Sequence, residues 1–402
     1  MQRVVIDEPY EFVPPVYSEW WPWMLRFILR RYIRKLYGVT EIECRHVDRL
    51  KASLAAGHSI LLAPNHSHMA DPMVLGVLGM EADCHLYAMA SWHVFKQSRF
   101  QTFMTRRMGA FSILREGNDR QAIETAIDIL VSRRRPLIVF PEGAITRHND
   151  LIGEMMDGPS FIARQVAKRL KKEGKPGGVV IHPVATRYSF HGDLAKAVGP
   201  DLDALETLMS WQPQHHLPIV ERITKIGQAL LSLKEIDFLG APGNGNIYER
   251  ADKLVEEVLS RLESEWHITD SSGNAMMRVK RIRTAILPDM VAGNVTPEER
   301  ERRWRDLAAA YYVQQISHYP RDYILRDKNL PERVIETVER LQEDFTDKNS
   351  LHEPLHATIQ VGEAIPVGTQ RNRDELGDPI MADVRRQLQG MIDEMAAERT
   401  PV

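Results

Sequence analysis

Short apolar runs alternate with helix-like stretches along the first half of the chain. The runs occupy residues 59–64, 85–89, 137–140 and 179–185, with a shorter one around Ile113, and helical periodicity covers residues 91–107, 119–134 and 158–173. Strands that alternate with helices in sequence usually pair in parallel, because each helix returns the chain to the same end of the sheet. The pattern therefore predicts a layered α/β fold, with a partly parallel sheet flanked by helices.

The chain changes character after Gly199, and this predicts a second structural region. Residues 200–350 are rich in charge and in helical pattern, and Thr296-Pro297-Glu298-Glu299 has the form of a capping box at a helix start. Alternating strand character returns at residues 356–366. The expected regions are an N-terminal segment over 1–40, an α/β core over 41–199, a large helical insertion over 200–350, and a C-terminal strand and helix over 351–402 that rejoin the core.

The first 40 residues predict an N-terminal amphipathic helix. Between Trp20 and Tyr37, six apolar residues recur at helical spacing: Leu25, Ile28, Leu29, Tyr32, Ile33 and Leu36. Basic residues gather on the other side, and tryptophans crowd the start of the segment. The pattern fits a helix in the headgroup layer of a membrane, where an indole ring is buried while its N–H stays in water. It fits equally an amphipathic helix that packs on the protein's own core.

Composition narrows the classes of function. The 402 residues carry a net charge of -3, without the basic excess that favours nucleic acid as a partner. The two cysteines, Cys44 and Cys84, are too few for a disulfide framework or a cysteine-based zinc module, which is typical of a reducing, cytoplasmic compartment. The N-terminus lacks the pattern of a secretion signal, and no run approaches the ~18 apolar residues expected of a spanning helix.

A histidine and a carboxylate follow the apolar run at residues 59–64. Asn65 and His66 come directly after this predicted strand, and Asp71-Pro72 opens the next predicted helix. The turn between them allows Asp71 to accept a hydrogen bond from one nitrogen of His66, which leaves the other nitrogen free to take a proton from a hydroxyl. Asp-Pro is also a common helix start, and Asp378-Pro379 uses the same pair with no histidine, so a simple helix cap is an alternative for Asp71.

Three further blocks extend this motif. Gly109 and Arg115 flank a short apolar run that contains Phe111. The third block is Phe140-Pro141-Glu142-Gly143, and the fourth is an apolar run around Pro183. With Asn65, His66 and Asp71 as the first block, these blocks resemble, in their order, those of the glycerolipid acyltransferase family, which includes bacterial 1-acylglycerol-3-phosphate acyltransferase. The resemblance covers about residues 40–190.

The resemblance implies transfer of a fatty acyl group from acyl-CoA or acyl carrier protein to the hydroxyl of a lysophospholipid-like acceptor. His66 would be the general base and Asp71 its orienting partner. Arg115 would bind an anionic headgroup through its planar fork, and Glu142 with the Gly143 backbone would shape the acceptor pocket. The reaction requires no metal, no cofactor besides the thioester co-substrate and no covalent acyl-enzyme. We expect a peripheral or monotopic enzyme at the cytoplasmic face of a membrane.

One departure from the family pattern concerns the acceptor site. The family usually continues Glu-Gly with Thr-Arg, whereas here Thr146-Arg147 follows two residues later. Arg147 is a candidate for binding the acceptor. Because the pair is displaced, an acceptor without glycerol phosphate, such as a lyso-aminolipid, is an alternative. Asn65 is a further candidate, as the residue that holds the turn presenting His66.

Two other functions compete with acyl transfer. His66 and His68 are spaced for a paired-imidazole metal site of a metal-dependent hydrolase. The further ligands that the sequence offers are His85, His93, His182 and Asp71. Alternatively, the basic, aromatic N-terminus and the helical insertion are the binding surfaces of a non-catalytic scaffold at a membrane. Metal analysis tests the first alternative, and a His66→Ala protein with unchanged function would favour the second.

Overall fold

The structure is a computed structural model that describes residues 5–117, 119–325, 330–370 and 377–398. The chain folds into two compact units. The helical unit comprises Met1–Glu11, Arg115–Asn118 and Asp193–Ser350, and the α/β unit comprises Phe12–Leu114, Asp119–Gly192 and Leu351–Val402. The predicted α/β fold, N-terminal helix and helical insertion are confirmed.

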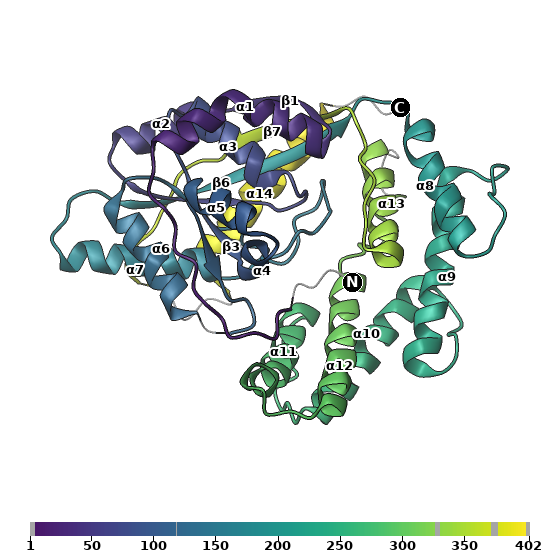
Figure 1. Cartoon of the computed structure of the whole chain (residues 1–402). Coiled ribbons are helices and arrows are strands. Elements are labelled where there is room, and N and C mark those ends of the chain that lie inside the picture. The colour runs from purple at the N-terminus through teal and green to yellow at the C-terminus, as the bar shows by residue number, and fades with distance from the viewer. Residues whose placement is uncertain (1–4, 118, 326–329, 371–376, 399–402) are drawn as a thin grey trace. The chain divides into compact units, whose positions relative to one another are not determined.

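The α/β unit is built on an eight-stranded sheet (Figure 1). Its strands are β1 (Val39–Arg45), β2 (Ser59–Pro64), β3 (Tyr87–Ser91), β4 (Ala110–Ile113), β5 (Leu137–Ile138), β6 (Val179–Phe190), β7 (Leu355–Val361) and β8 (Ile365–Pro366). The spatial order is β1-β7-β6-β2-β5-β3-β4, and β8 also pairs with β6. The pairs β6–β7 and β6–β8 are antiparallel and the other pairs are parallel, as expected for a partly parallel sheet.

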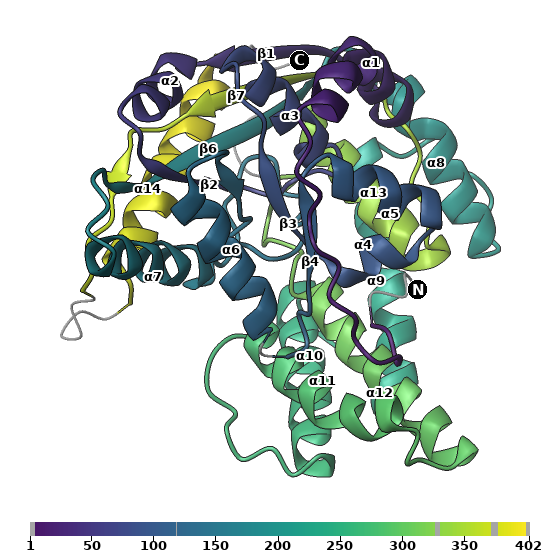
Figure 2. The same cartoon turned by 60° about the vertical axis from the view of Figure 1, so that its left-hand side comes forward.

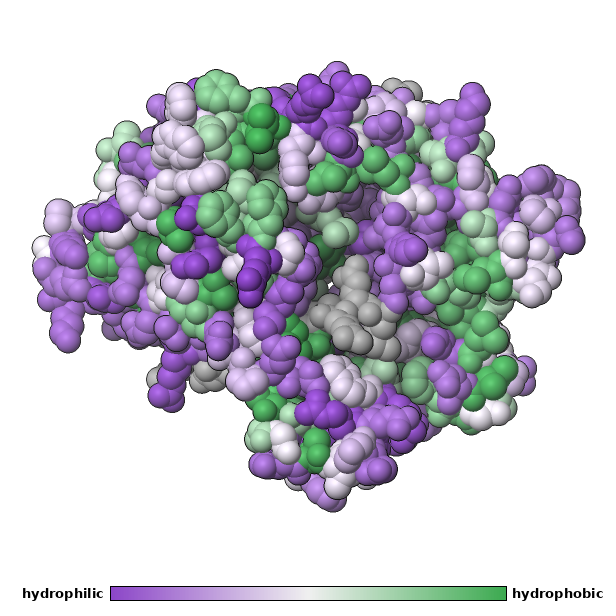
Figure 3. All heavy atoms as spheres, in the orientation of Figure 1, coloured by the Kyte–Doolittle hydropathy of each residue, from purple (hydrophilic) through white to green (hydrophobic). Residues whose placement is uncertain are grey.

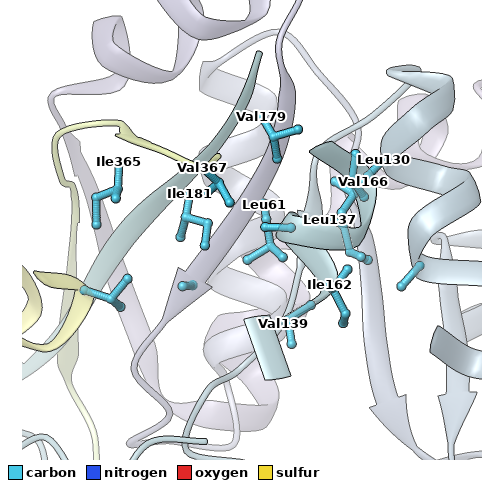
Figure 4. Close-up of a cluster of buried hydrophobic side chains, with 14 of the residues drawn as sticks. Leu61, Leu130, Leu137, Val139, Ile162, Val166, Val179, Ile181, Ile365 and Val367 are labelled. Atoms are coloured by element: carbon cyan, nitrogen blue, oxygen red, sulfur yellow. The ribbon is translucent and has the colours of Figure 1, made fainter. Parts of the chain in front are cut away.

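Helices cover both faces of this sheet (Figure 2). They are α1 (Trp20–Tyr37), α2 (Val47–Ala55), α3 (Asp71–Glu81), α4 (Trp92–Lys96), α5 (Arg99–Arg107), α6 (Arg120–Ser132), α7 (Gly158–Lys172) and α14 (Pro379–Ala397). Leu61 and Ala63 of β2 pack with the cluster that α6, α7 and α14 complete (Figure 4). Ile60 and Leu62 alternate with them and point to the other face, where α1 and α3 contact the sheet. Burial on both faces explains why β2 is a continuous apolar run.

The helical unit consists of α8 to α13. These are α8 (Leu194–Leu208), α9 (Ile219–Leu239), α10 (Ile247–Glu265), α11 (Ala275–Ala292), α12 (Pro297–Ile316) and α13 (Pro331–Thr346). Apolar side chains of α10, α11 and α12 form a core of their own. The helix start predicted at Thr296 is confirmed, because the Thr296 side chain accepts a hydrogen bond from the Glu299 N–H.

The apolar stripe predicted on α1 is buried along only one of its two rows. Leu25, Leu29 and Ile33 are buried against the α/β unit, whereas Ile28, Tyr32 and Leu36 are exposed. The two rows are neighbours on the helix surface, so α1 packs on the core with one edge of the stripe and leaves the other apolar row at the surface.

The single helix predicted over residues 91–107 is two helices. α4 ends at Lys96, and the Ser98 side chain caps α5 by accepting a hydrogen bond from the Gln101 N–H. Ser98 is extended, so the chain changes direction there. Serine competes with the helical backbone for hydrogen bonds, which explains a break that apolar periodicity alone did not indicate.

Replacing Asp378 should destabilise the α/β unit strongly. Its buried carboxylate caps α14 and accepts hydrogen bonds from Ser160 and both terminal nitrogens of Arg164 on α7. Asp378→Ala leaves the buried Arg164 charge without this partner, so we expect a loss of about 3–5 kcal/mol in the free energy of unfolding, measured by urea denaturation. Asp383→Ala is the control, because its pair with the exposed Arg386 contributes less than about 1 kcal/mol.

The same pair predicts a dependence of stability on pH. Burial alone raises the pKa of Asp378, but hydrogen bonds from Arg164 and Ser160 outweigh it and hold this pKa at about 2. Because the folded pKa lies below the ordinary value of about 4, the stabilisation is present above about pH 4 and is lost as the pH falls through about 2. The difference in stability between wild type and Asp378→Ala should shrink over that range. An equal difference at pH 7 and pH 2 would contradict the assignment.

Candidate active site

His66 lies just past the carboxyl end of β2, and a carboxylate holds its ring. Nδ1 of His66 is 2.9 Å from Oδ2 of Asp71. A carboxylate can only accept here, which places the proton on Nδ1 and leaves a lone pair on Nε2. The ring also stacks on Phe140, with 4.0 Å between ring centroids. The side chain of His66 is 14% exposed, so the imidazole is fixed in orientation but still reaches the surface.

Asp71 is the first residue of α3 and does not cap it. The cap position is Ala70, and no side chain caps this helix. The fully buried carboxylate instead accepts hydrogen bonds from the His66 ring, from the His68 N–H at 2.9 Å and from the Tyr188 hydroxyl at 2.6 Å. The simple helix cap considered for Asp71 is therefore wrong, and the His66 ring is one of the three partners of its carboxylate.

Tyr188 is a site residue that the sequence did not reveal. It lies on β6, which continues beyond the end of β2, so that its hydroxyl donates to Oδ1 of Asp71 from 117 positions away in sequence. Burial and the charge and hydrogen bond of Asp71 raise the pKa of the Tyr188 phenol well above its ordinary value. The phenol therefore remains a donor at neutral pH.

Replacing Tyr188 by phenylalanine should lower kcat about tenfold and leave KM unchanged. Tyr188 touches Asp71, so losing its hydroxyl leaves one carboxylate oxygen less constrained and the imidazole less well oriented. Tyr319→Phe is a matched control, because the Tyr319 hydroxyl donates to Asp344 at 2.7 Å in the helical unit. Steady-state kinetics per folded molecule separate the two variants. A rise in KM for Tyr188→Phe with kcat intact would exclude the positioning role.

Glu142 follows β5, and the structure brings it to His66. Because β5 pairs in parallel with β2, the carboxyl ends of both strands lie at the same edge of the sheet. Oε1 of Glu142 accepts a hydrogen bond from the His66 N–H at 2.7 Å, and Oε2 accepts one from the Gly153 N–H at 2.8 Å. Burial raises the pKa of Glu142, while these two N–H groups oppose the rise. The two oxygens of the Glu142 carboxylate thus bind the backbone of His66 and the backbone of Gly153.

Asn65 and Thr146 fix the remaining backbone around His66. The Asn65 amide donates to the Thr186 carbonyl at 2.9 Å and accepts from the Thr186 N–H at 2.7 Å, so it joins the end of β2 to β6. The Thr146 N–H donates to the His66 carbonyl at 2.8 Å. His66 is therefore held through its N–H, its carbonyl and its ring.

Gly143 and Arg147 lie in the loop that contains Glu142. Gly143 has a φ of +67°, in the left-handed region that glycine adopts without strain. Arg147 is buried, also with positive φ, at 53°. Although Thr146-Arg147 comes two residues late in sequence, the loop brings Thr146 against the backbone of His66.

Arg115 lies in the helical unit, apart from the other six candidates, which belong to the α/β unit. The Thr284 hydroxyl of α11 donates to the Glu116 carbonyl at 2.9 Å, which joins this segment to α11. Arg283 is close by. Burial, together with the charge of Arg115, lowers the pKa of Arg283 to about 10, and the charge of Glu116 opposes this decrease. Arg115 is thus part of a cationic group inside the helical unit.

Three histidines of the alternative metal site, His68, His93 and His182, have other partners. His182 is buried, and its ring nitrogens bond to the Ser53 hydroxyl and the Gly362 carbonyl. Nδ1 of His68 accepts from the Ala70 N–H at 3.1 Å, and Nδ1 of His93 bonds to Ser91. Within the described ranges, no three or more His, Cys, Asp or Glu residues are grouped so as to hold a metal ion. The described helices also include none with the length and apolar character needed to cross a membrane.

Residues 41–187 match the family model described as Acyltransferase. This range contains the four sequence blocks, together with β2, β5 and most of β6. No match was found among curated proteins.

Proposed function

Residues 41–187 belong to the acyltransferase family, and from this we propose that the chain transfers a fatty acyl group from acyl-CoA or acyl carrier protein to the hydroxyl of a lysophospholipid-like acceptor. Family membership supports acyl transfer in general. The observation that carries the finer proposal is the hydrogen bond between His66 Nδ1 and Asp71 Oδ2, because it leaves Nε2 as a proton acceptor at the sheet edge.

In the proposed reaction, Nε2 of His66 takes the proton of the acceptor hydroxyl as its oxygen attacks the thioester carbonyl carbon. The carbon–sulfur bond then breaks, and the departing thiolate receives that proton, so the products are an ester and a free thiol. Asp71 stabilises the positive charge on His66 between these steps, and its burial strengthens the interaction. No covalent acyl-enzyme is needed, in line with the role of His66 as base rather than nucleophile.

Exposed apolar side chains near the site support a lipid substrate. Met69 lies in the loop between His66 and Asp71, and Met156 lies against Gly143; both are exposed. Flexible thioethers suit contact with acyl chains of varied shape. Arg147 is our candidate for binding the acceptor's anionic group. Arg115 is a second candidate, because the family resemblance implies this role for it. The exposed apolar row of α1 supports a peripheral position on a membrane.

The experiment that tests the proposal uses labelled acyl-CoA, acyl carrier protein and a panel of lysolipids that includes lysophosphatidic acid and a lyso-aminolipid. We expect thioester consumption to depend on an acceptor and one acceptor to be esterified preferentially. Metal analysis and chelation accompany the assay, because a metal-dependent hydrolase would release free fatty acid and lose activity with a chelator. Absence of turnover with every acceptor in the presence of membranes would refute acyl transfer and favour the scaffold.

A further inference from the structure

α5 continues the exposed surface of α1. Phe103 of α5 meets Trp21 of α1 edge-on, with 5.6 Å between ring centroids, and Trp21 in turn contacts Trp20 at 5.1 Å. The guanidinium of Arg107 lies 3.6 Å from the centroid of the Phe103 ring. Both helices belong to the α/β unit, so this is one continuous surface, which we call the α1–α5 face.

Large aromatic rings on the α1–α5 face project into solvent. Phe100 is 74% exposed on α5, and Phe27 and Trp20 are 69% and 57% exposed on α1. Each such ring leaves on the order of 100 Å² of apolar surface in water, and grouped rings of this size are typical of interaction sites. In the view of Figure 3, hydrophobic and hydrophilic residues are intermixed along the top, where Figure 1 places α1.

All charged residues of the two helices that form the α1–α5 face are basic. The sequence has no Asp or Glu from Trp20 to Thr40, and none from Cys84 to Arg115. Exposed cations in these segments include Arg31, Lys35 and Arg99. Since the whole chain has a net charge of -3, positive charge is concentrated here and negative charge lies elsewhere. The face is therefore complementary to an anionic partner.

A groove opens on the α5 side of this face. It has a volume of about 550 Å³ and is lined by residues of α4 and α5 with Ser98 between them, among them Phe95 and Phe103 with Lys96, Arg99 and Arg106. Apolar walls with a rim of guanidinium and ammonium groups match the boundary between acyl chains and phosphates in a lipid layer.

We propose that the α1–α5 face docks on an anionic lipid bilayer, with Phe100 inserted among the headgroups and Lys96 and Arg99 on lipid phosphates. The inference deepens the proposed function, which requires access to lipid. Acidic carrier protein is the competing occupant. A bilayer is favoured because tryptophan and phenylalanine project side by side from two helices, as in the aromatic belts of membrane proteins. The basic residues would add electrostatic attraction that falls as salt is raised.

The test is co-sedimentation of the full-length protein with vesicles. Wild type should bind vesicles of phosphatidylcholine mixed with phosphatidylglycerol more tightly than vesicles of phosphatidylcholine alone. Phe100→Ser should weaken binding to the mixed vesicles about tenfold, because one buried phenyl ring contributes about one power of ten in affinity. Phe100→Trp should restore it. Phe161→Ser is the matched control, since Phe161 is 49% exposed on α7, outside the α1–α5 face, and should bind as wild type does.

Vesicle binding by Phe100→Ser that equals wild type would overturn the inference. If this variant then bound acyl carrier protein more weakly than wild type does, the carrier protein would be the occupant of the face. Both measurements are independent of turnover. Failure of the proposed function would appear instead as absence of thioester consumption by the wild-type protein. Circular dichroism of Phe100→Ser confirms that the variant is folded.

Discussion

Replacing His66 by glutamine should lower kcat for acyl transfer by about a thousandfold. Glutamine keeps a polar side chain of similar length but cannot take a proton from the acceptor hydroxyl. The contacts that hold this position through the backbone, from Glu142 and Thr146, do not depend on the side chain. The variant should therefore fold as wild type does. The measurement is release of free thiol from the acyl thioester in the presence of the preferred acceptor.

The helical unit offers a matched control for this variant. His215 also pairs with a carboxylate, Asp203, at 2.9 Å, but its side chain is largely exposed and it lies on no strand end. His215→Gln should keep wild-type turnover. A His66→Gln protein that retains more than about a tenth of wild-type kcat would remove His66 from the role of general base, since acid–base catalysis is worth at least ~10²-fold.

The part of the site that could be predicted from sequence is the part made by short-range chain geometry. His66 and Asp71 are separated by one turn between a strand and a helix, so their contact follows from local structure. Glu142 reaches the same place because β2 and β5 are parallel neighbours, whose carboxyl ends share one edge. The first contact is local, whereas the second joins residues 76 positions apart and follows from the parallel pairing that alternating strands and helices predict.

The residues that sequence could not place depend on strand length and on the packing of whole helices. Tyr188 reaches Asp71 only because β6 continues past β2 and pairs with β7, and no local pattern fixes that length. Likewise, the periodicity of α1 does not tell which apolar row meets the core, since Leu29 and Ile28 both fit a helical stripe. Arg115 follows β4 directly, yet it joins the helical unit through tertiary contacts.

Replacing Asp71 by asparagine should lower kcat by two to three powers of ten, roughly, while costing little stability. Asparagine has nearly the same shape. Its oxygen can accept from His66 and His68, and its amide can donate to the Tyr188 hydroxyl oxygen, so the three hydrogen-bonding groups around it remain paired. What the variant loses is the negative charge beside the imidazole. Pre-steady-state and steady-state release of thiol, together with a thermal melt, measure both effects.

Comparison with Asp71→Ala separates the charge of Asp71 from its role in positioning. Alanine also leaves the buried His68 N–H and Tyr188 hydroxyl without an acceptor, which should cost about 1–3 kcal/mol of stability for each group. If orientation alone mattered, Asp71→Asn would retain nearly full kcat and only Asp71→Ala would be slow. If the carboxylate stabilises the protonated His66, both variants are slow and only Asp71→Ala is unstable. We expect the second result, because a fully buried charge acts on its neighbour with little screening from water.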